Sequence, residues 1–197
     1  MACLVLDPVT LEVIPGSEFM TYMRPDDLNT VDNTPEKQRA LSINGITRDK
    51  LANAPVWKVG FQAFASHLKR VVPSGGKPYA VGKNIRNFDL PITNRVCRQL
   101  GLTTPGGNNQ LFDHRWNFQI EDFAMPWLLW PGLVDSISMD ALRAFFGMSQ
   151  EKSHDALFDV RQTAWLFRKF VKFITAKAST VRFANAAAAD GGLLHAS

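Results

Sequence analysis

A histidine and an aspartate lie close together near the start of the last long amphipathic stretch of the sequence. His154 and Asp159 are five positions apart in the run SHDALFD. An imidazole titrates near neutral pH, and a histidine beside a carboxylate is the pairing that general-base catalysis needs. The alternative is an ordinary helix start, in which Ser153 caps the helix and acidic residues of the first turn favour its dipole. Asp155 fits this alternative well, whereas Asp159 lies beyond the first free amides.

A second group of polar residues stands in VGKNIRNFD, where a short strand is followed by a helix. Ligands of α/β sheets gather at the carboxyl ends of strands, so Asp89 is well placed for a site. An aspartate in a first helical turn also favours the helix dipole, and that reading of Asp89 alone is the stronger one. A third pair, Glu121 and Asp122 in IEDF, receives little weight because acids at strand ends are usually solvated.

The elements that must position these residues can be read from the hydrophobic pattern. Residues 2–25 predict two or three strands in a meander, and later strands are expected at 77–82 and 118–123. Helices are expected over 36–41, 55–72, 88–101, 138–148 and 155–177. Strands first, then alternating helices and strands, favour a mixed sheet with helices on both faces. The sequence therefore predicts one α/β domain over residues 1–177 and a flexible, low-complexity tail over 178–197.

Composition narrows the class of protein. The chain has 197 residues with a formal net charge of +4, and the sequence pI is about 9.2. A basic protein favours a polyanionic partner, although charge alone is weak support. Cys3 and Cys97 stand far apart and indicate buried thiols of a reducing compartment. The apolar run at 123–134 is too short to span a bilayer, and no secretory segment follows Met1, so we expect a cytoplasmic protein without membrane contact.

The order of these segments resembles the DnaQ-like 3′–5′ exonucleases of the DEDDh type. That family carries an Asn-x-x-x-Phe-Asp motif and a His-x-x-x-x-Asp motif, and both occur here with the right spacing, as Asn84, Phe88 and Asp89, and as His154 and Asp159. The resemblance covers roughly residues 3–173, including the run ALSINGIT before the second helix of the family. It implies an RNase H-like fold, a three-layer α/β/α arrangement around a mixed sheet.

The resemblance also implies a chemistry. Four carboxylates would hold two divalent cations, Mg²⁺ or Mn²⁺, which prefer oxygen ligands and activate water for in-line attack on phosphate. Asp89 and Asp159 would be metal ligands, and His154 would take the proton from water. Asn84 and the backbone of Gly45 and Ile46 would position the 3′-terminal nucleotide. Either Ile46 or Phe88 would lie against a base, although Phe88 is equally well explained as a core residue. Lys83, Arg86 and Arg161 could meet phosphates.

The sequence departs from the family in one respect. The family's first strand carries an Asp-x-Glu pair, and this chain has only Asp7, Glu12 and Glu18 among its early acids, none of them in that pattern. The fold is thus expected to lack its first central strand, which leaves two inner strands with unpaired edges. A truncated chain, a degenerate homologue that binds without cutting, or replacement by a tail segment such as STVRF would each explain this. We favour truncation because every later motif is intact.

Two classes of function follow from this interpretation. The leading hypothesis is a metal-dependent 3′–5′ exonuclease that removes nucleotides from single-stranded DNA or RNA 3′ ends, with the chain as given expected to be inactive. The alternative is a non-catalytic nucleic-acid-binding or polymerase-associated module derived from such an enzyme. The sequence does not distinguish DNA from RNA, and it does not reveal the oligomeric state or a polymerase partner.

Overall fold

The strands of the protein form two separate pairs. The computed structural model describes residues 1–72, 76–151 and 155–180. Its strands are β1 (Ala2–Cys3), β2 (Phe19–Met20), β3 (Ala80–Gly82) and β4 (Asn117–Gln119). β1 pairs antiparallel with β2, β3 pairs parallel with β4, and no ladder joins the two pairs within the described residues. The predicted α/β class is confirmed, but the regular strands at the start of the chain are shorter than the expected meander.

Helices make up most of the remaining structure. They are α1 (Pro35–Ile43), α2 (Arg48–Ala52), α3 (Trp57–Val71), α4 (Asp89–Gln99), α5 (Ile120–Ala124), α6 (Met139–Phe145) and α7 (Ala156–Thr180), with a 3₁₀ turn η1 (Leu28–Thr30) and a π-helical turn η2 (Met125–Leu129). The predicted helices are confirmed, and local signals set their ends. Ser138 accepts the backbone N–H of Ala141 at 3.1 Å at the start of α6. Gly101 and Gly147 follow α4 and α6 with φ values of +68° and +64°.

The predicted strand at 118–123 is wrong in its second half. β4 ends at Gln119, and the chain turns into α5 at Ile120. The Asp122 carboxylate accepts the backbone N–H of Gln119 at 3.1 Å, which is half of a reciprocal capping box. Asp122, three residues after the polar cap Gln119, therefore favours a helix here. The spacing of the apolar residues in 118–123 had predicted a strand. α2 was also missed; Thr47 caps it by accepting the backbone N–H of Lys50 at 3.1 Å.

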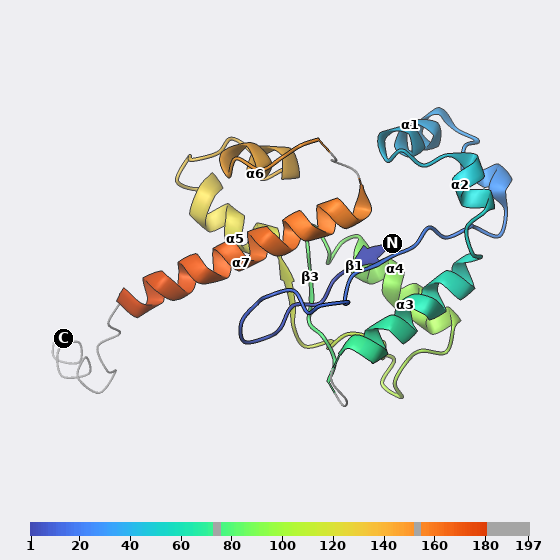
Figure 1. Cartoon of the computed structure of the whole chain (residues 1–197), viewed down its shortest axis with the longest axis horizontal. Helices are drawn as coiled ribbons and strands as arrows, with labels where there is room; N and C mark the ends of the chain where they lie inside the picture. Colours follow the sequence, from blue (N-terminus) through green and yellow to red (C-terminus); the bar gives the residue numbers. More distant parts are fainter. Residues whose placement is uncertain (73–75, 152–154, 181–197) are drawn as a thin grey trace, which may run out of the picture.

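The long helix α7 connects the two strand pairs. It packs against β1, β2 and β3 as well as α5, and Figure 1 shows it crossing the molecule above β1 and β3. Two ion pairs tie it to the first hairpin, from Arg161 to Glu18 at 2.6 Å and from Arg168 to Glu12. No ladder joins the two strand pairs within the described residues. α7 therefore connects them by packing against strands of both pairs.

Two apolar clusters form the core, and the segment that begins with β1 contributes to both. The first lies beneath α7 and includes the fully buried Ile120, Leu142 and Leu166. The second lies between α3 and α4 and includes the buried Phe61 and Cys97. Leu6 packs on the first cluster, whereas Cys3 and Val5 pack on the second. The two faces of the segment that begins with β1 are thus each covered by helices.

A buried histidine joins α3 to the first hairpin. His67 Nε2 lies 2.9 Å from the carbonyl oxygen of Ser17, so Nε2 carries the proton. Its Nδ1 then accepts from the Arg70 guanidinium at 2.9 Å. Because both ring nitrogens are occupied, His67 is a structural residue.

The C-terminal boundary differs slightly from the prediction. α7 continues through Thr180, so residues 178–180, which the sequence assigned to the tail, are helical. The rest of the predicted tail, 181–197, lies outside the described residues. Cys3 and Cys97 are both free thiols. In the described part of the chain, no helix has the length and apolar character that crossing a bilayer requires.

Candidate functional site

The turn between β3 and α4 holds Asn84 in an unusual conformation. Asn84 has a φ of +52°, in the left-handed region that asparagine adopts more readily than most residues. Its backbone N–H donates to the two carboxylate oxygens of Glu121 at 3.0 and 3.1 Å, and Lys83 Nζ donates to the same carboxylate at 2.7 Å. Desolvation pushes the pKa of Glu121 upward, but these hydrogen bonds outweigh it and hold the pKa below its usual value. Glu121 therefore fixes the turn that precedes Asp89.

Phe88 and Asp89 stand at the first turn of α4. Phe88 is 63% exposed, so the interpretation of this ring as a core residue is wrong. Asp89 also retains substantial exposure, yet desolvation by the atoms packed around its carboxyl raises its pKa, against the opposing effect of its own backbone N–H. The exposed ring of Phe88 can contact a base. The Asp89 carboxyl group beside it can contact a sugar hydroxyl or a cation.

Asp159 lies on the first turn of α7 and is bound by a buried arginine. Arg143 Nη2 donates to Asp159 Oδ1 at 2.5 Å, and Arg143 as a whole is only 2% exposed. The same guanidinium donates to Gln162 Oε1 at 2.5 Å and to Asp140 Oδ1 at 3.0 Å. The Gln162 amide in turn donates to the carbonyl of Ser149 at 2.7 Å. One Asp159 oxygen is therefore already occupied by a charge-assisted hydrogen bond.

The start of α7 is capped by an aspartate. Asp155 Oδ1 accepts the backbone N–H of Phe158 at 2.9 Å, which agrees with the structural role that the sequence suggested for Asp155. His154, the expected general base, and Ser153, the expected cap, lie outside the described residues. The geometry of the His154–Asp159 pair therefore stays a prediction.

The expected nucleotide-positioning segment lies in the turn between α1 and α2. Gly45 has a φ of +59°, as the Asn-Gly turn requires. Its carbonyl accepts from Lys50 Nζ at 2.8 Å, and the N–H of Ile46 donates to the carbonyl of Leu41 at 2.9 Å. Ile46 is half-buried. Because both groups are used locally, the backbone of this turn has less capacity to bind a nucleotide than the resemblance suggested.

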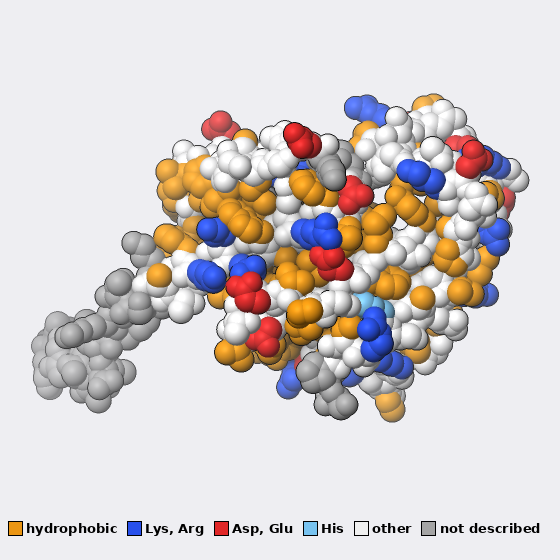
Figure 2. Space-filling model, in the orientation of Figure 1, with side chains coloured by type: hydrophobic (Ala, Val, Ile, Leu, Met, Phe, Trp, Pro, Cys, Tyr) orange, Lys and Arg blue, Asp and Glu red, His pale blue; other side chains and the backbone are white. Residues whose placement is uncertain are grey.

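The three basic residues expected at phosphates are paired with acids. Lys83 pairs with Glu121 at 2.7 Å and Arg86 binds Asp122 through two hydrogen bonds of 2.8 and 2.7 Å. Arg161 pairs with Glu18, as described above. On the face that Figure 2 shows, basic and acidic side chains of the described residues alternate, with no continuous basic stripe. To contact a phosphate, each of these basic side chains would have to break its existing ion pair.

Within the described residues, no complete set of metal ligands is present. Nowhere in residues 1–72, 76–151 and 155–180 do three or more histidine, cysteine or acidic side chains converge as metal ligands would. Asp89 and Asp159 have different hydrogen-bond partners, and the convergence of their side chains on one cleft stays a prediction. Two sets of contacts are therefore described: the turn built on Asn84, Phe88 and Asp89, and the ionic cluster of Asp159.

The sequence alone missed two residues of these features. Arg143 contacts the Asp159 carboxylate from α6, and the only local signal was a basic residue among the apolar side chains of LRAFF. Glu121 received little weight because it was placed on a strand end, whereas the start of α5 directs it to the turn at Asn84. Both contacts span many residues of sequence, so the hydrophobic pattern did not reveal them.

Comparison with known proteins adds no further support for this resemblance. No protein-family model matches the chain, and no curated protein matches it at a significant level. The likeness to DnaQ-like exonucleases therefore rests on the two motifs and on the order of the elements that carry them.

Proposed function

We propose that this chain is the nuclease-fold part of a DnaQ-like 3′–5′ exonuclease that acts on single-stranded DNA or RNA ends. One observation carries the proposal: Asp89 opens α4, which follows β3 and the turn at Asn84, and Asp159 lies on the first turn of α7, which packs against β1, β2 and β3. We infer that the two strand pairs and α7 belong to an RNase H-like arrangement without its central strand.

The two-ion centre of the family does not fit the residues that the structure describes. Asp89 and Asp159 are two carboxylates where four are needed, and Arg143 already occupies one oxygen of Asp159. Two carboxylates would leave two divalent cations largely uncompensated. We therefore expect the chain as given to bind 3′ ends without cutting them.

The turn before α4 is the part of the chain best suited to hold a nucleotide. The exposed ring of Phe88 offers a stacking surface, which every base can use regardless of sequence. Asn84 Oδ1 accepts from Asn87 Nδ2 at 3.0 Å, which orients the Asn84 amide so that its NH₂ group can donate to a sugar or phosphate oxygen. Glu121 keeps this turn in place through the contacts to Lys83 and Asn84. The turn thus recognises the terminal nucleotide in this proposal.

The alternative function is a non-catalytic nucleic-acid-binding or polymerase-associated module. The ion pair between Asp159 and Arg143 favours it, because a carboxylate held by a buried guanidinium is a poor metal ligand. This module would bind single strands in a salt-sensitive manner without any metal requirement.

A 3′-exonuclease assay separates the two functions. A 3′-labelled single strand is incubated with the chain as given, and with a form extended at its N-terminus by in-frame coding sequence, in Mg²⁺, Mn²⁺ or EDTA. The exonuclease proposal expects mononucleotide release by an extended form that carries an Asp-x-Glu pair, and loss of that release in Asp159→Ala. Metal-independent binding by both forms, without release by either, would support the module instead.

A further inference from the structure

Aromatic and basic side chains gather in the two segments that precede the parallel strands. Because β3 and β4 are parallel and in register, residues just before β3 and residues just before β4 lie at the same end of the pair. Five exposed side chains at this end define the strand-start surface: Lys77, Tyr79, His114, Arg115 and Trp116. The surface lies at the opposite end of β3 from the turn at Asn84.

Local contacts hold the two segments together. The backbone N–H of Asp113 donates to the carbonyl oxygen of Pro78 at 3.0 Å. The Asp113 carboxylate accepts the backbone N–H of Arg115 at 2.9 Å and binds its guanidinium through hydrogen bonds of 3.0 and 2.7 Å. The ring of Tyr79 rests edge-on against Phe118, with the ring centroids 6.2 Å apart. The strand-start surface is thus ordered before any ligand binds.

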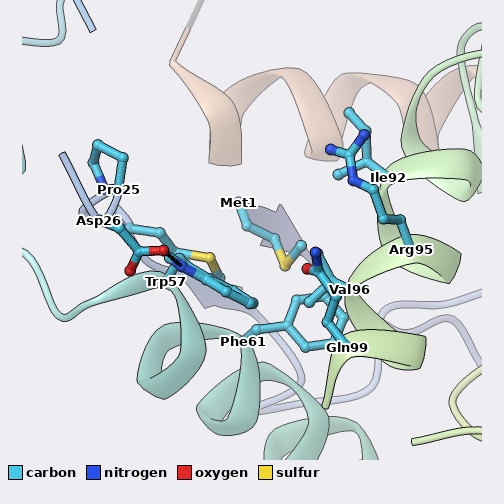
Figure 3. A pocket seen from close by; sticks show the side chains of 10 residues that line it. Met1, Pro25, Asp26, Trp57, Phe61, Ile92, Arg95, Val96 and Gln99 are labelled. Atoms are coloured by element: carbon cyan, nitrogen blue, oxygen red, sulfur yellow. Dashed lines mark hydrogen bonds between the residues drawn. The ribbon is translucent and has the colours of Figure 1, made fainter. Parts of the chain in front are cut away.

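Trp116 differs from a tryptophan that stabilises the fold. Trp57 lines a cavity of about 470 Å³ beside α3 and α4, and Figure 3 shows its indole donating to Asp26, at 2.9 Å. Trp116 is 59% exposed, and its indole has neither a hydrogen bond nor a ring contact in the part of the chain that the structure describes. Tyr79 is 49% exposed. Two rings with free area at one end of a strand pair offer a surface for stacking.

The cations of this surface can reach a phosphate without breaking an ion pair. Among the described residues, neither Lys77 nor His114 has a hydrogen-bond or ion-pair partner for its side chain. The Arg115 side chain is 65% exposed, so its remaining N–H groups can donate to a second anion while it stays paired with Asp113. Asp113 is the only acid in residues 76–79 and 113–116. The local charge is therefore positive, as binding of a polyanion requires.

The strand-start surface does not depend on the missing central strand. That strand would lie between the two strand pairs. β4 already occupies one edge of β3, so another strand can join β3 only at the opposite edge. β3 therefore separates that place from β4 and from the segment with Trp116 that precedes it.

We propose that the strand-start surface binds single-stranded nucleic acid, with bases stacked on Trp116 and Tyr79 and with phosphates beside Lys77, His114 and Arg115. A single strand fits because its unpaired bases can lie against the rings, whereas a duplex keeps them stacked on one another. The surface is a second contact on the strand whose terminal nucleotide binds before α4, so it rests on the proposed function for its class of ligand. It requires no 3′ end.

A circular single strand tests this surface separately, because it has no 3′ end for the turn at Asn84 to hold. We expect fluorescence polarisation to show saturable binding of a labelled circle by the full chain. Trp116→Ala should weaken this binding roughly tenfold or more. Trp116 is exposed, so the thermal unfolding midpoint should change little. Trp130→Ala is the matched control, because Trp130 is 87% exposed and both of its sequence neighbours are apolar.

A linear strand of the same length tests the proposed function in the same assay. Tighter binding of the linear strand than of the circle, and loss of that difference in Phe88→Ala, belong to the turn before α4. Binding of the circle that depends on Trp116, without any preference for the linear strand, would support the strand-start surface and contradict recognition of the 3′ end.

Two further measurements separate stacking from charge. Each phosphate contact on a single strand contributes about 0.7 to the slope of log K against log salt, so Lys77→Gln should reduce that slope by about this amount. Binding should quench tryptophan fluorescence, and Trp116→Phe should retain more affinity than Trp116→Ala while losing part of the quench. Equal affinity of the original chain, Trp116→Ala and Trp130→Ala for the circle would overturn the proposal. Binding of a duplex or of inorganic polyphosphate as tight as that of the circle would also overturn it.

Discussion

The guanidinium of Arg143 contacts the carboxylate of Asp159 at 2.5 Å, although Arg143 is almost fully buried and Asp159 stays partly exposed. The contact joins α6 to α7, and Gln162 and Asp140 complete the set of acceptors around the arginine. The residue that the motif identifies as a metal ligand is therefore also a structural partner. Substitution of Asp159 will affect stability as well as any activity.

Replacing Arg143 should destabilise the fold. Arg143→Leu leaves the acceptor of Gln162 and a carboxylate of Asp159 without their donor, and we expect the free energy of unfolding to fall by about 1–3 kcal/mol. Urea denaturation measures this change. Arg115→Leu is the control, because the guanidinium of Arg115 is 65% exposed and its ion pair with Asp113 should contribute less to stability than the buried Arg143 cluster. Equal losses for both variants would show that the Arg143 cluster is not structural.

Divalent cations should leave the stability of the chain as given unchanged. A ligand that binds the folded state raises its stability, whereas the described carboxylates form no group of three or more that could hold an ion. We expect thermal unfolding midpoints in Mg²⁺, Mn²⁺ and EDTA to agree. A rise of several degrees that is specific to one cation, and lost in Asp89→Asn, would instead reveal a metal site that includes Asp89.

Phe88 should contribute to single-strand binding. Removal of a stacked aromatic ring costs about 1–3 kcal/mol per base, so Phe88→Ala should weaken binding of a 3′-ended single strand roughly tenfold or more. Trp130→Ala serves as the control, since Trp130 is 87% exposed and belongs to a different segment. Titration at two salt concentrations separates stacking from phosphate contacts. If both variants bind as tightly as the original chain, the nucleotide-binding turn is wrongly assigned.

We expect the free energy of unfolding to fall as the Asp89 carboxyl group ionises. Its pKa in the folded state lies above the usual value of 3.8 because of desolvation. A raised pKa means that the folded state binds the proton more tightly, so the contribution of Asp89 is full below pH 3.8 and is lost as the pH rises through the folded-state pKa. Asp89→Asn should therefore increase stability at pH 7 relative to pH 3.5.

Asp113 provides a contrast of opposite sign for the same measurement. Its hydrogen bonds with Arg115 lower its pKa to about 2, so the stability that it contributes is present above pH 3.8 and is lost as the pH falls towards 2. Asp113→Asn should lower the free energy of unfolding at pH 7 and change it little near pH 2. Thermal unfolding of both variants across this range tests the signs, and a shared direction would contradict the assignment for Asp89.

The sequence predicted the elements whose structure depends on interactions between residues close together in the chain. The helices α3, α4, α6 and α7 follow from apolar periodicity and from caps such as Ser138 and the glycines after α4 and α6. The turn at Asn84 was also found in the right place, after β3 and before α4. Each of these signals acts within a few residues, so one sequence is enough to show it.

The contacts between distant segments could not be predicted in this way. The Arg143–Asp159 and Glu121–Asn84 contacts depend on how α6 packs on α7 and on how α5 begins beside β3. The capping box of Gln119 and Asp122 also prevailed over the strand-like apolar spacing of residues 118–123. The motif thus proposed Asp159 as a metal ligand but did not reveal that a buried arginine would bind it.

The position of α7 has a consequence for cooperativity. The two strand pairs share no ladder in the described residues, and the two apolar clusters occupy different sides of the segment that begins with β1. α7 contacts β1, β2 and β3, and the segment that begins with β1 packs on both clusters, so the apolar packing of these elements couples the halves. Each ion pair from α7 to Glu12 and Glu18 has an exposed partner and should contribute little to that coupling. Loss of the packing of α7 on β1 and β3 would allow the half formed by α3 and α4 to melt separately from the half beneath α7.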